Sequence, residues 1–113
     1  MTNTRELPHH RLHAFRIARE MLLATRDAGI GDAKLRDEAL RAAKGMCLNI
    51  AEGAGRYTRA DKARAYTIAR GEAVECAAAL EIASLLDHAR AEDAKRVALL
   101  ANQVVAMLTR LIR

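Results

Sequence analysis

The chain has 113 residues, a formal net charge of +5, and 51% hydrophobic but only 3% aromatic residues. This length fits a single domain over residues 1–113, and no window holds the roughly 18 apolar residues of a membrane-spanning helix. The first ten residues lack the apolar run of a signal peptide, so we expect a cytoplasmic protein whose Cys47 and Cys76 are reduced core residues.

The first two helical patterns follow a polar stretch, residues 1–7, which we expect to be frayed. Pro8 suits the first turn of a helix over about residues 8–28, which Gly29 ends. Its apolar face carries Leu12, Phe15, Ala18 and Leu22. Asp32 can cap the second helix. The apolar face of that helix carries Leu35, Ala39, Ala42, Ala43, Met46 and Ile50.

Two glycines, Gly53 and Gly55, follow the second pattern and are predicted to form the turn that reverses the chain. Thr58, with Asp61 three residues later, resembles a capping box that opens a third helix. The seam of the third helix is Tyr66, Ala69, Ala73, Cys76, Leu80 and Ala83, and that of the fourth is Val97, Leu100, Val104, Met107 and Leu111. Four amphipathic helices with short links predict an all-α, antiparallel up-down four-helix bundle.

Four polar residues stand at positions of the middle two helices that should face the core. They are Asn49, Glu52, Arg56 and Glu75. Because buried polar groups need partners, we expect a structural network in which Arg56 pairs with Glu52 or Glu75. Removing one partner of such a buried pair, as in Glu52→Ala, is expected to cost about 3–5 kcal/mol. Gly71, which costs about 1 kcal/mol against Ala in mid-helix, suggests a close approach by Asn49 or Glu52.

Enzymatic chemistry finds little support in the sequence. His9 and His13 have a metal-compatible spacing, but no carboxylate or thiol stands near them in sequence. Glu52 and Glu75 could face each other, but neither has the His three residues later that di-iron bundles require. We therefore predict a protein without enzymatic activity, with no catalytic residue, metal site or cofactor.

Basic residues are unevenly distributed, since residues 1–70 hold 14 Lys or Arg and 8 Asp or Glu. This excess favours an anionic partner such as nucleic acid, although composition alone fits a merely soluble basic surface equally well. The candidate phosphate contacts on the outer face are Arg16, Arg19, Lys34, Arg41, Lys44, Arg59, Lys62 and Arg64. Of the three aromatic residues only Tyr57 is placed to stack on a base, so we expect sequence-tolerant contacts to the phosphate backbone.

The segment NIAEGAGR at residues 49–56, followed by IARG at 68–71 and by Glu75, carries a family resemblance. It resembles the signature of a family of small four-helix-bundle proteins. Their genes were first noticed in intervening sequences of bacterial 23S ribosomal RNA genes. The resemblance covers roughly residues 12–112. Gly45 and Glu72 depart from it, because the family usually has Ser at both positions.

The resemblance implies a basic homo-oligomer, with five subunits favoured, and an RNA or DNA partner. Relatives include accessory proteins of diversity-generating retroelements, which bind nucleic acid and a reverse transcriptase, so a reverse transcriptase is also implied as a partner. A thin core rich in alanine independently favours self-association, because alanine buries little area per residue. The alternative is a structural or protein-interaction module that does not bind nucleic acid.

Overall fold

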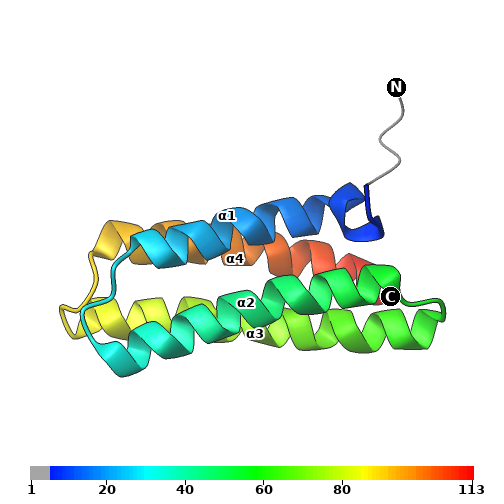
Figure 1. Ribbon diagram of the computed structural model, residues 1–113. Helices are drawn as coiled ribbons and strands as arrows, with labels where there is room; N and C mark the ends of the chain where they lie inside the picture. Colours follow the sequence, from blue (N-terminus) through cyan, green and yellow to red (C-terminus); the bar gives the residue numbers. More distant parts are fainter. Residues whose placement is uncertain (1–5) are drawn as a thin grey trace.

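The computed structural model describes residues 6–113 and contains four long helices and one short 3₁₀ helix (Figure 1). In chain order, the elements are η1 (Pro8–Arg11), α1 (His13–Asp27), α2 (Ala33–Gly55), α3 (Arg59–Leu85) and α4 (Ala91–Ile112). The described residues form no strand, and none of the helices that they form is long and apolar enough to cross a membrane. The predicted all-α class is therefore confirmed.

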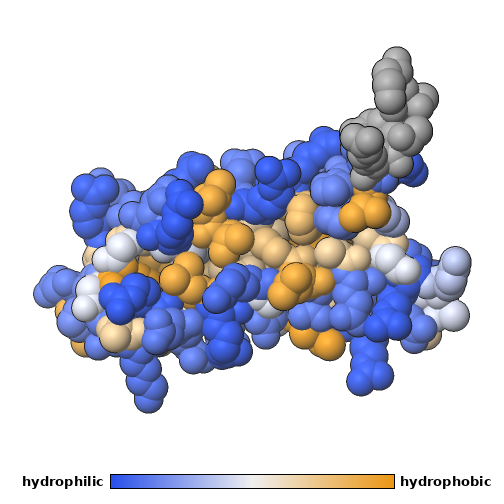
Figure 2. Space-filling view, viewed as in Figure 1, coloured by the Kyte–Doolittle hydropathy of each residue, from blue (hydrophilic) through white to orange (hydrophobic). Residues whose placement is uncertain are grey.

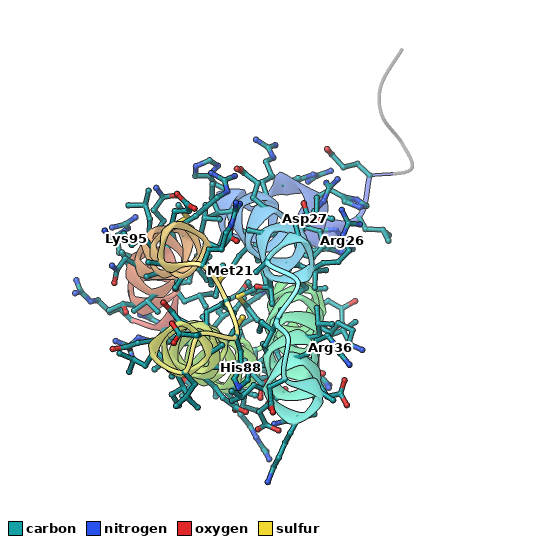
Figure 3. The ribbon with its side chains drawn as sticks, turned by 90° about the vertical axis from the view of Figure 1, so that its left-hand side faces the viewer. Met21, Arg26, Asp27, Arg36, His88 and Lys95 are labelled. Carbon is teal, nitrogen blue, oxygen red and sulfur yellow. The ribbon has the colours of Figure 1, made fainter. Side chains whose placement is uncertain are left out.

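The helices form the predicted antiparallel up-down bundle. Each packs against its sequence neighbours, and α4 closes the arrangement by packing against α1 (Figure 3). One end of the bundle holds the start of α1, the α2–α3 turn and the end of α4, and we call it the turn end (Figure 1). The opposite end, which holds the α1–α2 and α3–α4 connections, is called the loop end.

The helix starts follow from local capping. Asp32 Oδ2 accepts the backbone N–H of Leu35 at 2.9 Å, and Thr58 Oγ1 accepts the N–H of Asp61 at 3.0 Å. Both caps lie where the sequence predicts them, and each satisfies an N–H that has no partner inside its helix. The predicted first helix is interrupted, because Leu12 is extended (φ −86°, ψ 125°) and separates η1 from α1.

The loop end is held by a backbone contact between its two connections and by a side-chain contact from α2 to the first of them. The Gly31 N–H donates to the carbonyl of His88 at 2.8 Å, and Arg36 Nη1 donates to the carbonyl of Ile30 at 3.2 Å. Asp87, which follows the cap of α3, has a φ of 62°. This left-handed conformation ends α3 without the glycine that usually occupies such a position.

The core is built from many alanines and a few larger side chains. The largest fully buried ones include Met21, Ile30, Met46, Ile50, Leu80, Val97, Val104 and Leu108. Met21 lies in the centre of the bundle, whereas Arg26, Arg36 and Lys95 project outward (Figure 3). The two cysteines are free and buried, as predicted. Burial raises the pKa of Cys47 to about 11 and also raises the pKa of Cys76, so both thiols stay protonated at neutral pH.

The predicted glycine turn is wrong, because α2 continues through Gly53 and Gly55. The chain reverses instead over residues 56–58, which lie between α2 and α3. Gly53 serves helix packing, since it is buried against the ring of Tyr66. A Cβ atom at Gly53 would lie 2.5 Å from Cε1 of that ring, so no larger residue fits without displacing the ring.

Two other glycines differ in what surrounds them. A Cβ atom at Gly71 would meet nothing within 4 Å, so the predicted close approach of Asn49 or Glu52 to Gly71 is wrong. A Cβ atom at Gly45 would collide with the carboxylate of Glu72 on α3. The two departures from the family pattern therefore face each other, and the missing side chain on α2 leaves room for the longer one on α3.

Candidate nucleic-acid interface

The α2–α3 turn presents an exposed aromatic ring. Arg56 leaves α2 in an extended conformation (ψ 157°), and Thr58 is also extended (ψ 150°) where α3 begins. Tyr57, between them, is 100% exposed, and Arg59, the first residue of α3, is also exposed. The turn therefore places a ring in solvent with an arginine close by on each side in sequence.

Lys62 caps α2 and is held by the fold. Its Nζ donates to the carbonyl oxygens of Gly53 at 3.3 Å and Ala54 at 3.1 Å, both in the last turn of α2. The Gly53 carbonyl also accepts the N–H of Arg56 at 3.3 Å, and carbonyls in the last turn of a helix lack the partners that residues further along the helix would supply. A cation beside them also complements the negative end of the helix dipole. Of the eight predicted phosphate contacts, Lys62 is thus one whose charge already has a structural use.

A polar surface pocket of about 380 Å³ lies between α2 and α3 at the turn end. Most of its lining is charged or polar: Asn49, Glu52, Arg56, Asp61 and Arg64 line it together with the apolar Ile68. Three of the four residues expected in a buried network therefore border a pocket that is open to solvent.

The predicted buried network is wrong in its burial and in most of its connections. Glu52 and Arg56 form the expected ion pair at 2.8 Å, and this contact raises the pKa of Arg56, but both side chains are 52% exposed. Asn49 Nδ2 donates to a backbone carbonyl one turn back in α2, at 2.8 Å. Glu75 pairs with Arg41 and not with the other three.

The helical period explains this outcome. Ile50 and Gly53 are the buried positions at the end of α2, which turns Glu52 and Arg56 toward solvent. An exposed ion pair of this kind contributes little to stability, because water and salt screen its charges. The predicted loss of about 3–5 kcal/mol in the free energy of unfolding of Glu52→Ala is therefore wrong, because that figure applies to buried pairs.

Arg41 is occupied by two carboxylates. Its Nη2 lies 2.7 Å from Oε2 of Glu38 and 2.7 Å from Oε2 of Glu75, so it links α2 to α3. Competition between the two carboxyls for a proton raises the pKa of Glu75, because a protonated Glu75 would donate a hydrogen bond to Glu38. The same hydrogen bond, together with Arg41, lowers the pKa of Glu38. Phosphate would have to displace these carboxylates before it could use this guanidinium.

The other predicted phosphate contacts are exposed, and residues 6–113 supply an ion-pair partner to none of them. They are Arg16 and Arg19 on α1, Lys34 and Lys44 on α2, and Arg59 and Arg64 on α3. The structure does not bring them into one patch. Lys34 lies in the first turn of α2 near the loop end, whereas Arg59 and Arg64 lie at the turn end.

Positive charge is concentrated in the half of the bundle at the turn end. That half holds ten Lys or Arg and four Asp or Glu, counted over residues 6–19, 45–72 and 103–113. The half at the loop end holds eight Lys or Arg and ten Asp or Glu, counted over residues 20–44 and 73–102. The described part of the protein is therefore polarised along the bundle axis, with one basic end.

Sequence reasoning missed three members of this basic end. Arg70 lies in the first half of α3, and its Nε donates to Oγ1 of Thr109 near the end of α4 at 2.9 Å. Arg110 and Arg113 follow on α4 and are exposed. The available signal was the antiparallel order itself, because it places the first turns of α3 beside the last turns of α4.

The two histidines considered as metal ligands belong to different elements, since His9 lies in η1 and His13 begins α1. The ring of His9 packs edge-on against Phe15, with ring centroids 4.6 Å apart. Within residues 6–113, no group of three or more His, Cys, Asp or Glu side chains is arranged to hold a metal ion.

Comparison with known sequences identifies the family. A sequence model described as 23S rRNA-intervening sequence protein matches residues 11–110, which include α1, α2, α3 and nearly all of α4. No match is found among curated proteins. The matched region also contains the segment at residues 49–56 that leads into the exposed turn. The chain therefore belongs to the 23S rRNA-intervening sequence protein family.

Proposed function

We propose that this protein binds nucleic acid, without catalysing a reaction, through the basic half of the bundle at its turn end. The observation that carries this proposal is the uneven charge, with ten basic and four acidic residues in that half. A surface of one predominant sign attracts a polyanion over several ångströms and raises its local concentration. Arg and Lys both bind phosphate, the former through a planar fork of donors and the latter as a point charge.

The contacts assigned by this proposal differ from the predicted set. Exposed residues of the basic half are favoured: Arg16, Arg19, Arg59, Arg64, Arg110 and Arg113. Arg41 and Lys62 contribute charge but are engaged in hydrogen bonds. A binding role also suits the exposed, paired carboxylates here, because catalytic groups usually lie in clefts that perturb their pKa values.

We further propose that the protein assembles with copies of itself. Figure 2, viewed onto α1 and α2, shows an apolar band between strips of hydrophilic residues. Leu23 on α1 and Leu48 on α2 are 48% and 70% exposed. On the other side, a groove of about 430 Å³ between α3 and α4 is lined mainly by apolar residues such as Val74, Ala98 and Val105. If one apolar face of each copy contacts the other apolar face of the next copy, the repeated contact can close into a ring. The family resemblance favours five copies.

The test is a salt titration of binding to total bacterial RNA and to duplex DNA, followed by gel shift. Affinity should fall by roughly 0.7–0.9 log units per log unit of salt for each phosphate neutralised. A folded Arg59→Glu/Arg64→Glu variant should bind at least about tenfold more weakly, with a shallower salt dependence. The matched control is Lys34→Glu/Arg96→Glu, which changes the charge equally in the loop-end half, away from the α3–α4 groove, and should stay within about threefold of wild type.

The outcomes separate three readings. Loss of binding in the turn-end variant alone supports the proposal. Equal losses in both variants would mean that net charge, and not the basic end, determines binding. No binding of wild type at low salt would contradict the proposal.

A second function, a protein-interaction module, is favoured by the same apolar groove between α3 and α4. Its occupant would be a partner protein, and the family resemblance makes a reverse transcriptase the first to test. Co-purification with that enzyme, in the absence of any nucleic-acid binding, would favour this alternative.

A further inference from the structure

We propose that the α2–α3 turn binds an unpaired nucleic-acid strand, with the ring of Tyr57 stacking on a base. This inference rests on the proposed nucleic-acid binding and specifies its substrate as single-stranded. The contacts assigned are a stacking residue at the tip and cationic contacts from Arg59 and Arg64 on α3.

Tyr57 has no packing role in the described structure. It is 100% exposed, whereas Tyr66 is buried and Phe15 packs against the core. An aromatic ring left wholly in water gains nothing from burial, so both of its faces are free for a ligand that covers them. The base faces of an unpaired strand are ligands of that kind, since every base presents a flat aromatic surface.

The contacts on either side of Tyr57 fix the backbone of the turn. On one side, Lys62 secures the last carbonyls of α2, with Nζ to oxygen distances of 3.3 and 3.1 Å. On the other side, Thr58 caps α3 through its 3.0 Å bond from the N–H of Asp61. Only residues 56–58 lie between the two fixed helix ends. Because the segment is short and both of its ends are fixed, its backbone loses little conformational entropy when the ring binds a base.

Phosphate groups find donors beside the ring. Arg59 is exposed at the first turn of α3, where the N-terminal end of a long helix also favours negative charge. Arg64 lines the 380 Å³ pocket, which also contains Arg56 and Asn49 and the acidic residues Glu52 and Asp61. Proteins that bind single strands with little sequence preference combine an aromatic ring that stacks on a base with nearby cations that contact the phosphates.

Duplex fits this arrangement poorly. In a double helix the flat faces of the bases are covered by their neighbours, so a single ring at a turn reaches only grooves and phosphates. The turn carries no apolar wedge residue that could separate stacked bases, since Arg56, Thr58 and Arg59 surround Tyr57. We therefore expect Tyr57 to be the side chain by which the protein distinguishes an unpaired strand from a duplex.

The experiment measures binding of fluorescent 15-nucleotide oligo(U), oligo(dT) and a 15-base-pair duplex by anisotropy at fixed salt. Tyr57→Ala should weaken binding of both single strands by about 5- to 150-fold, the range for loss of one stacked base. The control Tyr57→Phe, which keeps the ring, should stay within about twofold of wild type. Tyr57→Ala should leave the duplex affinity, the melting temperature and the salt slope unchanged, because no phosphate contact is removed.

The results also separate this inference from the function on which it rests. If Tyr57→Ala binds single strands as well as wild type does, or weakens duplex equally, the stacking site is wrong. In that case a loss of binding in Arg59→Glu/Arg64→Glu would leave the proposed function standing. If wild type binds none of the three oligonucleotides, both proposals fall together.

Discussion

At the scale of the residue, the surroundings of a cation decide its role. Lys62 and Arg59 lie three residues apart at the start of α3, but only Lys62 reaches the carbonyls that end α2. We expect Lys62→Met, which keeps the aliphatic stem, to lower the free energy of unfolding by about 1 kcal/mol through loss of the cap and of the dipole interaction. Urea denaturation measures this.

The matched control is Arg59→Met, which should change the free energy of unfolding by less than about 0.5 kcal/mol, as exposed substitutions usually do. Nucleic-acid affinity should show the opposite ranking, because Arg59→Met should weaken binding more than Lys62→Met does. A Lys62→Met variant as stable as wild type would show that the cap contributes nothing.

At the scale of the element, the α2–α3 contact holds a pair of residues that should act together. Gly45→Ala gains helix propensity worth about 1 kcal/mol, but the new Cβ atom displaces the Glu72 carboxylate. In a Glu72→Ala background that obstacle is gone. We expect Gly45→Ala to stabilise the protein by about 0.5–1 kcal/mol there, and by less in wild type.

A double-mutant cycle over these four proteins, followed by thermal or urea unfolding, measures the coupling. Equal effects of Gly45→Ala in both backgrounds would mean that Glu72 swings aside freely. The matched substitution is Gly71→Ala on α3. Nothing lies within 4 Å of its added Cβ atom, so the propensity gain should show no dependence on Glu72.

At the scale of the whole molecule, apolar surface on two sides of the bundle predicts assembly. We expect light scattering at micromolar concentration to give a multiple of the 12.4 kDa chain mass, with five the favoured number. Val74→Lys, which places a charge in the α3–α4 groove, should shift the protein toward monomer, because an unpaired charge is costly to bury. A wild-type mass of 12.4 kDa would contradict the prediction.

The sequence predicts the bundle well, because helix periodicity and caps are local. Asp32 and Thr58 cap the helices as expected, and the apolar spacing identifies most of the buried positions. The predicted seam of α4 is wrong at its end, because Leu111 is exposed and Leu108 is buried instead. The burial of Glu52 and Arg56 is mispredicted, since a shift of one or two positions on a helix turns a side chain from core to solvent. A local apolar pattern therefore predicts where a helix lies, but it does not predict which residues at the edge of the buried face are exposed.

The candidate site is harder to predict, because its members come from separate segments. Tyr57 and Arg59 can be found from sequence, as they occupy one turn. Arg110 and Arg113 join them only through the antiparallel packing of α4. The sequence predicts a free cation at Lys62, because its two carbonyl partners, eight and nine residues away, become neighbours only once the chain has turned.

The charge imbalance between the two ends gives the subunit an electric dipole moment along its long axis. A polyanion would exert a torque on such a molecule before contact, so that the turn end arrives first and productive collisions become more frequent. In a ring whose symmetry axis runs along the bundles, these dipoles would lie side by side and parallel, which is repulsive. An anion bound across that rim would relieve the repulsion, so assembly and ligand binding would strengthen each other and respond to salt together.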